Sequence, residues 1–260
     1  MPDAGSLVLG GLGVSLVVGL MTAVGALPVL ALRQISPRGQ TALLGFGAGV
    51  MLAATFFSLL LPALELAGRS RSEAGAALLA IAGLLLGALG VRAAHHLVPH
   101  EHFYLGREGG RSEGLSRIWL FVLAITIHNF PEGLAVGVAW GGQDRANALG
   151  VATGIGLQNM PEGLAVAAAL LSEGYRRGQA FGVALLTGLV EPLGGLFGVA
   201  VVAVAQPLLP WALAFAAGAM LYVISDEIIP ETHRRGFQEI GTASLMAGFV
   251  TMLFLDVTLG

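Results

Sequence analysis

Two copies of one short motif carry side chains that could bind a metal ion. They read His128-Asn129-Phe130-Pro131-Glu132-Gly133 and Gln158-Asn159-Met160-Pro161-Glu162-Gly163. On a helix, residues four apart share a face, so His128 and Glu132 lie side by side, and the second copy repeats the arrangement. An imidazole nitrogen with carboxylate and amide oxygens suits a borderline divalent ion such as Zn²⁺ better than Na⁺ or Ca²⁺.

Both copies lie in the middle of long apolar segments, where a buried carboxylate or imidazole is costly and marks an ion or substrate path. Pro131 and Pro161 each lack an N–H, and they free the carbonyls of Ile127 and Leu157. At membrane depth such carbonyls persist only where protein, water or an ion satisfies them. The motifs therefore predict a metal site inside a membrane.

Further candidate ligands lie outside the two motifs. Glu191 is in an apolar segment directly before Pro192, although a protonated glutamate bonded to a neighbouring helix is the alternative. Three ionised carboxylates are better neutralised by two divalent ions than by one, so we expect a pair of metals sharing Glu132 and Glu162. Amides such as those of Gln158 and Asn159 also serve as plain bonds between membrane helices.

Composition places the chain in a membrane. Of 260 residues, 55% are hydrophobic and 11% are charged, whereas soluble proteins are nearer a quarter charged. The net charge of −3 argues against a nucleic-acid partner. Because the chain has no cysteine, any metal must use nitrogen, oxygen or thioether ligands.

A membrane span needs ~20 mostly apolar residues, and eight segments meet this requirement. They are about 6–32, 41–66, 74–98, 115–140, 146–171, 179–204, 208–233 and 242–259. We therefore expect an all-α polytopic membrane protein of eight transmembrane helices, with residues 1–260 forming one transporter domain.

The arginines of the connecting segments indicate the orientation of the chain. Ten of the 13 basic residues follow the first, third, fifth or seventh span: Arg33, Arg38, Arg92, Arg107, Arg111, Arg117, Arg176, Arg177, Arg234 and Arg235. The others are Arg69, Arg71 and Arg145. Because basic residues favour the cytoplasmic side, we expect both termini to lie outside the cytoplasm.

Internal repeats suggest how the spans are grouped. The fourth and fifth spans share the motif above, and Phe46–Leu52 in the second span resembles Phe215–Leu221 in the seventh. Together they suggest an inverted repeat of three spans, two central spans and three spans, a build that binds substrate at the midplane. This second match is what makes Met51 a candidate ligand; chance similarity between helices rich in Ala and Gly is the alternative.

Three other groups of residues could act along the ion path. The cytoplasmic loop of about residues 99–114, with the end of the third span, holds His95, His96, His100 and His102, for weak metal capture or simply as a solvated loop. Asp226, Glu227, Glu231 and His233 suggest an exit path, or an ordinary charged helix end. Glu65 and Asp256 could attract cations at the entrance, although charges at span ends are common.

The two central motifs resemble those of the ZIP family of metal-ion transporters, and specifically its bacterial GufA-like branch. Leu189–Gly195 and Val223–His233 add to the resemblance. It implies that a two-metal site is lined by His128, Asn129, Glu132, Gln158, Asn159, Glu162, Glu191 and Met51. It also implies transport of zinc and, in various members, iron, manganese or cadmium, commonly by a homodimer. Many members have histidine where this chain has Gln158.

We expect, then, a transporter in the bacterial inner membrane that carries Zn²⁺ or a similar divalent ion into the cytoplasm, and not an enzyme. One alternative is a membrane di-iron carboxylate enzyme, although such sites use Glu-x-x-His on two helices and only His128 lies at mid-membrane depth. Another is a proton-coupled carrier of an organic solute that uses the carboxylates as relays.

Overall fold

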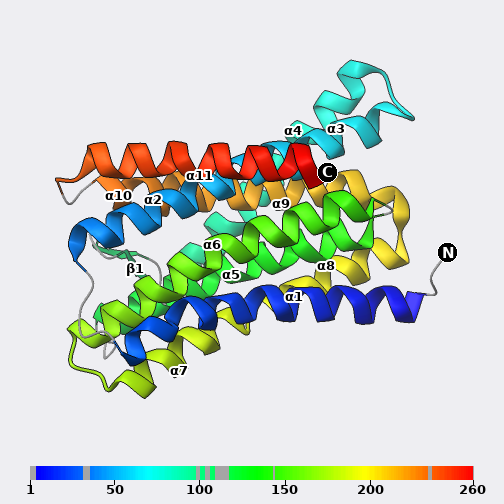
Figure 1. The fold of residues 1–260 in the computed structure, drawn as a ribbon. Helices are drawn as coiled ribbons and strands as arrows, with labels where there is room; N and C mark the ends of the chain where they lie inside the picture. The colour runs from blue at the N-terminus through cyan, green and yellow to red at the C-terminus, as the bar shows by residue number, and fades with distance from the viewer. Residues whose placement is uncertain are drawn as a thin grey trace.

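A bundle of long helices forms the protein in the computed structural model (Figure 1). It describes residues 4–31, 36–97, 100–102, 106–108, 117–142, 144–233 and 236–259. The elements are α1 (Ala4–Ala26), η1 (Leu27–Leu30), α2 (Pro37–Ala54), η2 (Thr55–Leu60), α3 (Leu61–Gly68), α4 (Glu73–Leu97), β1 (His100–His102), β2 (Gly106–Glu108), α5 (Arg117–Gly141), α6 (Arg145–Ser172), α7 (Arg177–Gly188), α8 (Glu191–Val204), η3 (Gln206–Leu208), α9 (Leu209–Val223), η4 (Ile224–Ile228), α10 (Ile229–His233) and α11 (Gln238–Leu259).

The all-α class is confirmed, with one small addition that the sequence did not predict. Strands β1 and β2 pair antiparallel, with His100 opposite Glu108 and His102 opposite Gly106. They lie within the segment that we expected to be a loop. The start of α1 and the end of α11 lie at the same end of the bundle (Figure 1).

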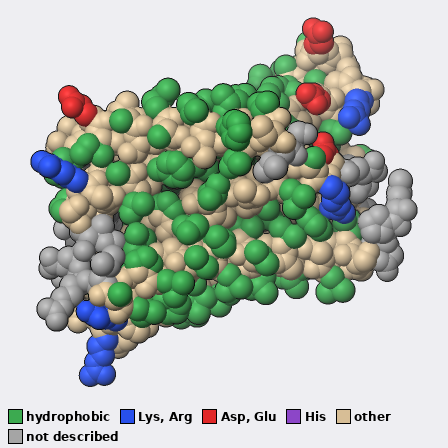
Figure 2. Space-filling view, in the orientation of Figure 1, with side chains coloured by type: hydrophobic (Ala, Val, Ile, Leu, Met, Phe, Trp, Pro, Cys, Tyr) green, Lys and Arg blue, Asp and Glu red, His purple; other side chains and the backbone are tan. Residues whose placement is uncertain are grey.

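The surface is that of a protein embedded in lipid. Figure 2 shows hydrophobic side chains over the middle of the bundle, with arginine and acidic side chains towards its two ends. Within the described residues, six helical segments are long and apolar enough to cross a membrane: Gly5–Leu30, Pro37–Gly68, Glu73–Ala94, Arg177–Ala203, Leu209–His233 and Gln238–Thr258. Helices α5 and α6, which carry the polar motifs, are 25 and 28 residues long and are not among these six.

Glycines hold the helices together in two groups. We call α1, α5, α6, α7 and α8 the first bundle, and α2, α3, α4, α9, α10 and α11 the second bundle. In the first, a side chain on Gly133 would collide with the backbone of Glu191, and one on Gly163 with the backbone of Thr22. Such close backbone packing is how small residues join helices in lipid.

The second bundle is joined in the same way. Gly49 of α2 lies against the carbonyl of Leu245 in α11, and Gly87 of α4 lies against that of Phe215 in α9. Because a rigid backbone leaves no room for even a methyl group at these crossings, the helices of each pair cannot shift independently. The α2–α11 pair and the α4–α9 pair are therefore each tightly fixed.

Contacts between the two bundles are of a different kind. A Cβ on Gly154 of α6 would meet the flexible end of the Met252 side chain in α11, and one on Gly47 of α2 would lie 3.7 Å from Gln158 Oε1. These are side-chain contacts that rotamer changes can relieve. The boundary between the bundles is therefore softer than the crossings inside them.

Candidate metal site

Both polar motifs lie inside continuous helices. Pro131 lies within α5 and Pro161 within α6, and neither proline ends its helix. The polar side chains on these turns are deeply buried, with exposed fractions of 1% for Asn129, 1% for Glu132 and 1% for Asn159. They therefore face the interior of the bundle and not the lipid, as polar side chains on an ion path do.

Glu191 enters this region from a broken helix. Helix α7 ends at Gly188 and α8 begins at Glu191, with Pro192 in its first turn. Pro192 has no N–H and its ring clashes with the carbonyl four residues earlier, which is that of Gly188, and this favours a break in the helix here. The break leaves Glu191, with an exposed fraction of 0%, at the start of α8 and against Gly133 of α5.

Hydrogen bonds join three helices of the first bundle at this point. Asn159 Nδ2 donates to Glu191 Oε1 at 2.6 Å and to the carbonyl oxygen of Val18 in α1 at 3.0 Å. Gln158 Nε2 donates to Asn159 Oδ1. The amide of Asn159 is thus held by α8 and α1, which fixes its orientation beside the carboxylate.

Several buried oxygens in this cluster have no hydrogen-bond partner among the described side chains. They are both carboxylate oxygens of Glu132, which lies close to the Gln158 amide without a well-formed hydrogen bond to it, Oδ1 of Asn129 and the second oxygen of Glu191, Oε2. Buried polar atoms without partners cost free energy and call for an explanation such as a bound ion or water. Carboxylate and amide oxygens fit a divalent cation.

The three carboxylates lie within reach of one another's charge. Glu132 interacts electrostatically with Glu162 and Glu191, and Glu191 with Glu162. Among the described residues, no three histidine or acidic side chains are placed to hold one ion together. The His128 side chain lies outside the described part, although its backbone is in α5. A shared site therefore also requires His128, the amides or a rearrangement.

A small cavity of about 30 Å³ lies beside Gln158 and Glu162. Helix α2 lines one side with residues that include Gly47, and Ile228 of η4 lines another. A space of this size can hold a single water. It connects the neighbourhood of the second motif to the segment that we predicted as an exit path.

Met51 is less clearly connected to the cluster. Its side chain is 1% exposed and packs in the main hydrophobic core. It lies one turn beyond Gly47, whose Cβ position is 3.7 Å from Gln158 Oε1. Its carbonyl accepts a hydrogen bond from Thr55. The assignment of Met51 as a ligand stays a prediction.

The predicted exit residues lie on η4 and α10. Asp226 and Glu231 are half-buried, and the side chain of Glu227 lies outside the described part. His233 Nδ1 lies 3.0 Å from the carbonyl oxygen of Ile229, and its Nε2 lies 3.3 Å from Thr242 Oγ1 in α11. His233 thus fastens the end of α10 to α11. The side chains of His95, His96, His100 and His102 lie outside the described part.

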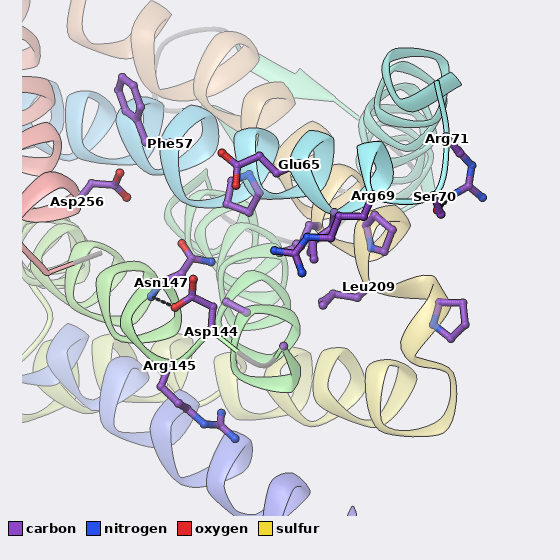
Figure 3. A pocket seen from close by; sticks show the side chains of 17 residues that line it. Phe57, Glu65, Arg69, Ser70, Arg71, Asp144, Arg145, Asn147, Leu209 and Asp256 are labelled. Carbon is purple, nitrogen blue, oxygen red and sulfur yellow. Dashed lines mark hydrogen bonds between the residues drawn. The ribbon is translucent and has the colours of Figure 1, made fainter. Parts of the chain in front are cut away.

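The two predicted entrance residues line one large cavity. Glu65 of α3 and Asp256 of α11 lie on the walls of a space of about 950 Å³ (Figure 3). Ser58 Oγ donates to Asp256 Oδ1 at 2.6 Å. The cavity lies at the same end of the bundle as the turn between α5 and α6, which also lines it.

Sequence reasoning missed other charged residues of this cavity. Asp144 lines it and caps α6 by accepting a hydrogen bond at 3.0 Å from the backbone N–H of Asn147. Arg69, Arg71 and Arg145 also line it, so its walls carry cations as well as carboxylates. The polar turn before α6 was the signal that could have identified Asp144.

Comparison with known proteins agrees with this geometry. The family model described as "ZIP Zinc transporter" matches residues 100–256. The zinc transporter GufA of Myxococcus xanthus is 51% identical over 96% of this chain and 99% of its own length. The zinc transporter ZIPB of Bordetella bronchiseptica is 46% identical over 92% of this chain and 78% of its own length. The human zinc transporter ZIP11 is 37% identical over 92% of this chain and 94% of its own length. The chain therefore belongs to the ZIP family of metal-ion transporters.

Proposed function

We propose that this protein carries Zn²⁺, or a similar divalent ion, across the inner membrane into the cytoplasm. The ion binds at the polar cluster of α5, α6 and α8, where two ions share Glu132 and Glu162. The full set of ligands is His128, Asn129, Glu132, Gln158, Asn159, Glu162, Glu191 and Met51. Relatives at 51% and 46% identity are named zinc transporters, which supports zinc as the substrate.

The observation that carries this proposal is the set of buried oxygens without partners on Glu132, Asn129 and Glu191. An apolar interior would not keep them unless something bound there. A divalent ion entering the cluster exchanges water ligands for these oxygens. Two such ions nearly neutralise three carboxylates, which lowers the cost of moving charge through a low-dielectric interior.

The ion's route follows the cavities. It enters by the large cavity beside Glu65 and Asp256, reaches the cluster, and leaves past the small cavity that Ile228 lines. Asp226, Glu227 and Glu231 then receive it on the cytoplasmic side. Weak capture by the histidines of residues 95–102 would hold the ion near the exit.

Movement of one bundle against the other gives alternating access. The closest crossings inside the bundles, such as Gly133 with Glu191, are backbone contacts at glycines, whereas Gly154 with Met252 and Gly47 with Gln158 are side-chain contacts between bundles. The site lies largely on the first bundle, so a shift of that bundle moves the ions relative to α2 and α9. The direction of transport is set by the metal gradient across the membrane and by the binding of metal in the cytoplasm.

Irregular helical segments at matching positions of the second and seventh spans support the inverted repeat of three, two and three spans. The π-helical segments η2 and η4 begin at Thr55 and Ile224, each nine residues after the matched Phe46 and Phe215. A proline follows each segment, at Pro62 and Pro230. Helices α5 and α6 are then the two central spans, which makes eight in one domain.

We expect the carboxyl terminus to lie outside the cytoplasm. Ten of the 13 basic residues follow odd-numbered spans, and the positive-inside rule places those segments in the cytoplasm. A reporter enzyme that is active only outside, fused after Gly260, should be active, and a reporter active only in the cytoplasm should not. Cytoplasmic activity at this position would rule out the eight-span topology.

Flux into sealed liposomes tests the transport function itself. Purified protein in metal-free liposomes should admit Zn²⁺ down its gradient without reductant or oxygen, and empty liposomes should not. A di-iron enzyme would show no flux and would need reductant and oxygen. A carrier of an organic solute would move protons with that solute and leave the internal zinc probe unchanged.

A further inference from the structure

An apolar groove runs along the lipid-facing side of α1 and α6. It has a volume of about 730 Å³ and is lined by Gly10, Gly13 and Val17 on α1 and by Leu149, Thr153 and Gly156 on α6. We call it the α1–α6 groove. The volume falls within the range of ligand sites, roughly 300–1,000 Å³.

Glycines make the groove hollow. A Cβ placed on Gly13 would meet nothing within 4 Å, and one on Gly156 would touch only Met21 Cγ at 3.5 Å. At the tight crossings of the first bundle, by contrast, a neighbouring backbone occupies the space beside the glycine, as at Gly133 and Gly163. Here they leave open space, flanked by the exposed side chains of Val17 (61%) and Leu149 (53%).

A cation lies at the outer end of the groove. Trp140 lines that end, and the guanidinium carbon of Arg145 lies 4.4 Å from the centre of its ring. Arg145 Nη1 also donates to the Trp140 carbonyl at 2.6 Å. In the described part of the chain Arg145 forms no ion pair, and in Figure 3 its side chain points away from Glu65 and Asp256. Its other N–H groups are available to an anion.

The dimensions match one leaflet of a bilayer. The groove extends along α1 from Gly10 to Met21, a rise of about 16 Å at 1.5 Å per residue. Half of the hydrocarbon core is ~15 Å. Arg145 and Trp140 then lie at the level of the head groups, where such residues gather. The inner end lies at Leu157, directly before Gln158.

We propose that the α1–α6 groove binds one acyl chain of an anionic phospholipid, whose phosphate Arg145 holds. The apolar lining and open glycines accept the chain, and the cation beside Trp140 selects the charge. Val18, which lines the groove, also accepts the hydrogen bond from Asn159. The bound lipid therefore packs against the pair of helices that orients this amide.

Quenching of Trp140 by brominated lipid tests the proposal without any transport measurement. Trp119→Phe and Trp211→Phe leave Trp140 as the only one of the three tryptophans. Each brominated lipid is titrated into phosphatidylcholine vesicles that contain this protein, and the fluorescence of Trp140 is recorded. Brominated phosphatidylglycerol should reach half of its maximum quenching at a mole fraction about fivefold lower than brominated phosphatidylcholine does. This is the preference that one cation gives for an anionic lipid.

Two variants separate the parts of the site. Arg145→Gln should abolish the preference for phosphatidylglycerol and keep the quenching, whereas Gly13→Leu should fill the groove and lower the maximum quenching by either lipid. Gly182→Leu on α7 is the matched control, because a Cβ there also meets nothing within 4 Å, and it should change neither quantity.

Two results would overturn the proposal. Quenching proportional to mole fraction and equal for both lipids would mean that only bulk lipid touches Trp140, and no quenching by either would mean that another protein copy covers the groove. Mass spectrometry of the intact wild-type protein in detergent gives a second readout that needs no variant. Bound phosphatidylglycerol should survive there in preference to phosphatidylcholine, and equal retention would contradict the site.

Discussion

Zinc flux should fall by at least about tenfold when Glu132 or Glu162 is replaced by glutamine, since losing even an outer-shell partner costs about 10- to 100-fold in metal affinity. Glutamine keeps the size of the side chain and removes one charge. In the proposed site these two carboxylates are shared by both ions, so either change leaves the pair of metals underneutralised. The measurement is initial zinc uptake by liposomes that contain equal amounts of inserted protein.

A matched control is available on the same helix. Glu173 caps the end of α6 and is exposed, so Glu173→Gln makes the same chemical change away from the site and should leave uptake unchanged. Gln158→Ala should lower uptake less than Glu162→Gln, because it removes a neutral ligand. If both glutamine variants of the motifs transported at the wild-type rate, the metal site would not lie at this cluster.

The sequence predicted the helices well where a helix is decided locally. Apolar runs of sufficient length predicted α1, α2, α4, α9 and α11, because in lipid every backbone group must be satisfied within its own segment. The segment 179–204 was predicted as one span, and the structure divides it at Leu189 and Val190. The proline rule predicts that break, but the same rule does not explain why α5 and α6 continue through Pro131 and Pro161.

The polar cluster was predicted in its members but not in its connections. Spacing alone put Asn159 and Glu162 on one turn. The bond from Asn159 to Glu191 depends on how closely α6 and α8 approach α1, and that approach is set by glycine contacts between distant segments, such as Gly163 with Thr22. A single sequence does not reveal which glycines meet which backbone. The carbonyl of Val18, and the position of Arg69, Arg71 and Arg145 on the wall of the large cavity, were missed because they too depend on which distant segments meet.

The sequence also did not predict the division into two bundles. If the bundles move against each other during transport, linking them should block it. A disulfide that joins the bundles should stop transport almost completely, because the ions can then face only one side. The chain has no native cysteine, so Gly154→Cys with Met252→Cys introduces a single defined pair. A Cβ on Gly154 would meet the end of the Met252 side chain, so these positions face each other across α6 and α11, and loss of free thiol on oxidation checks that the disulfide has formed before uptake is measured.

The expected result is uptake that nearly vanishes on oxidation and returns on reduction. The matched control is Gly156→Cys with Met21→Cys, which replaces the same residue types two positions along α6 but joins it to α1 within the first bundle, where Met21 Cγ lies 3.5 Å from the Cβ position of Gly156. Because α1 and α6 belong to one tightly packed unit, that bond should form and leave uptake close to the reduced value. Zinc flux that persists with the first pair fully oxidised would show that the bundles do not move against each other during transport, and access would then have to alternate by smaller changes within α5 and α6.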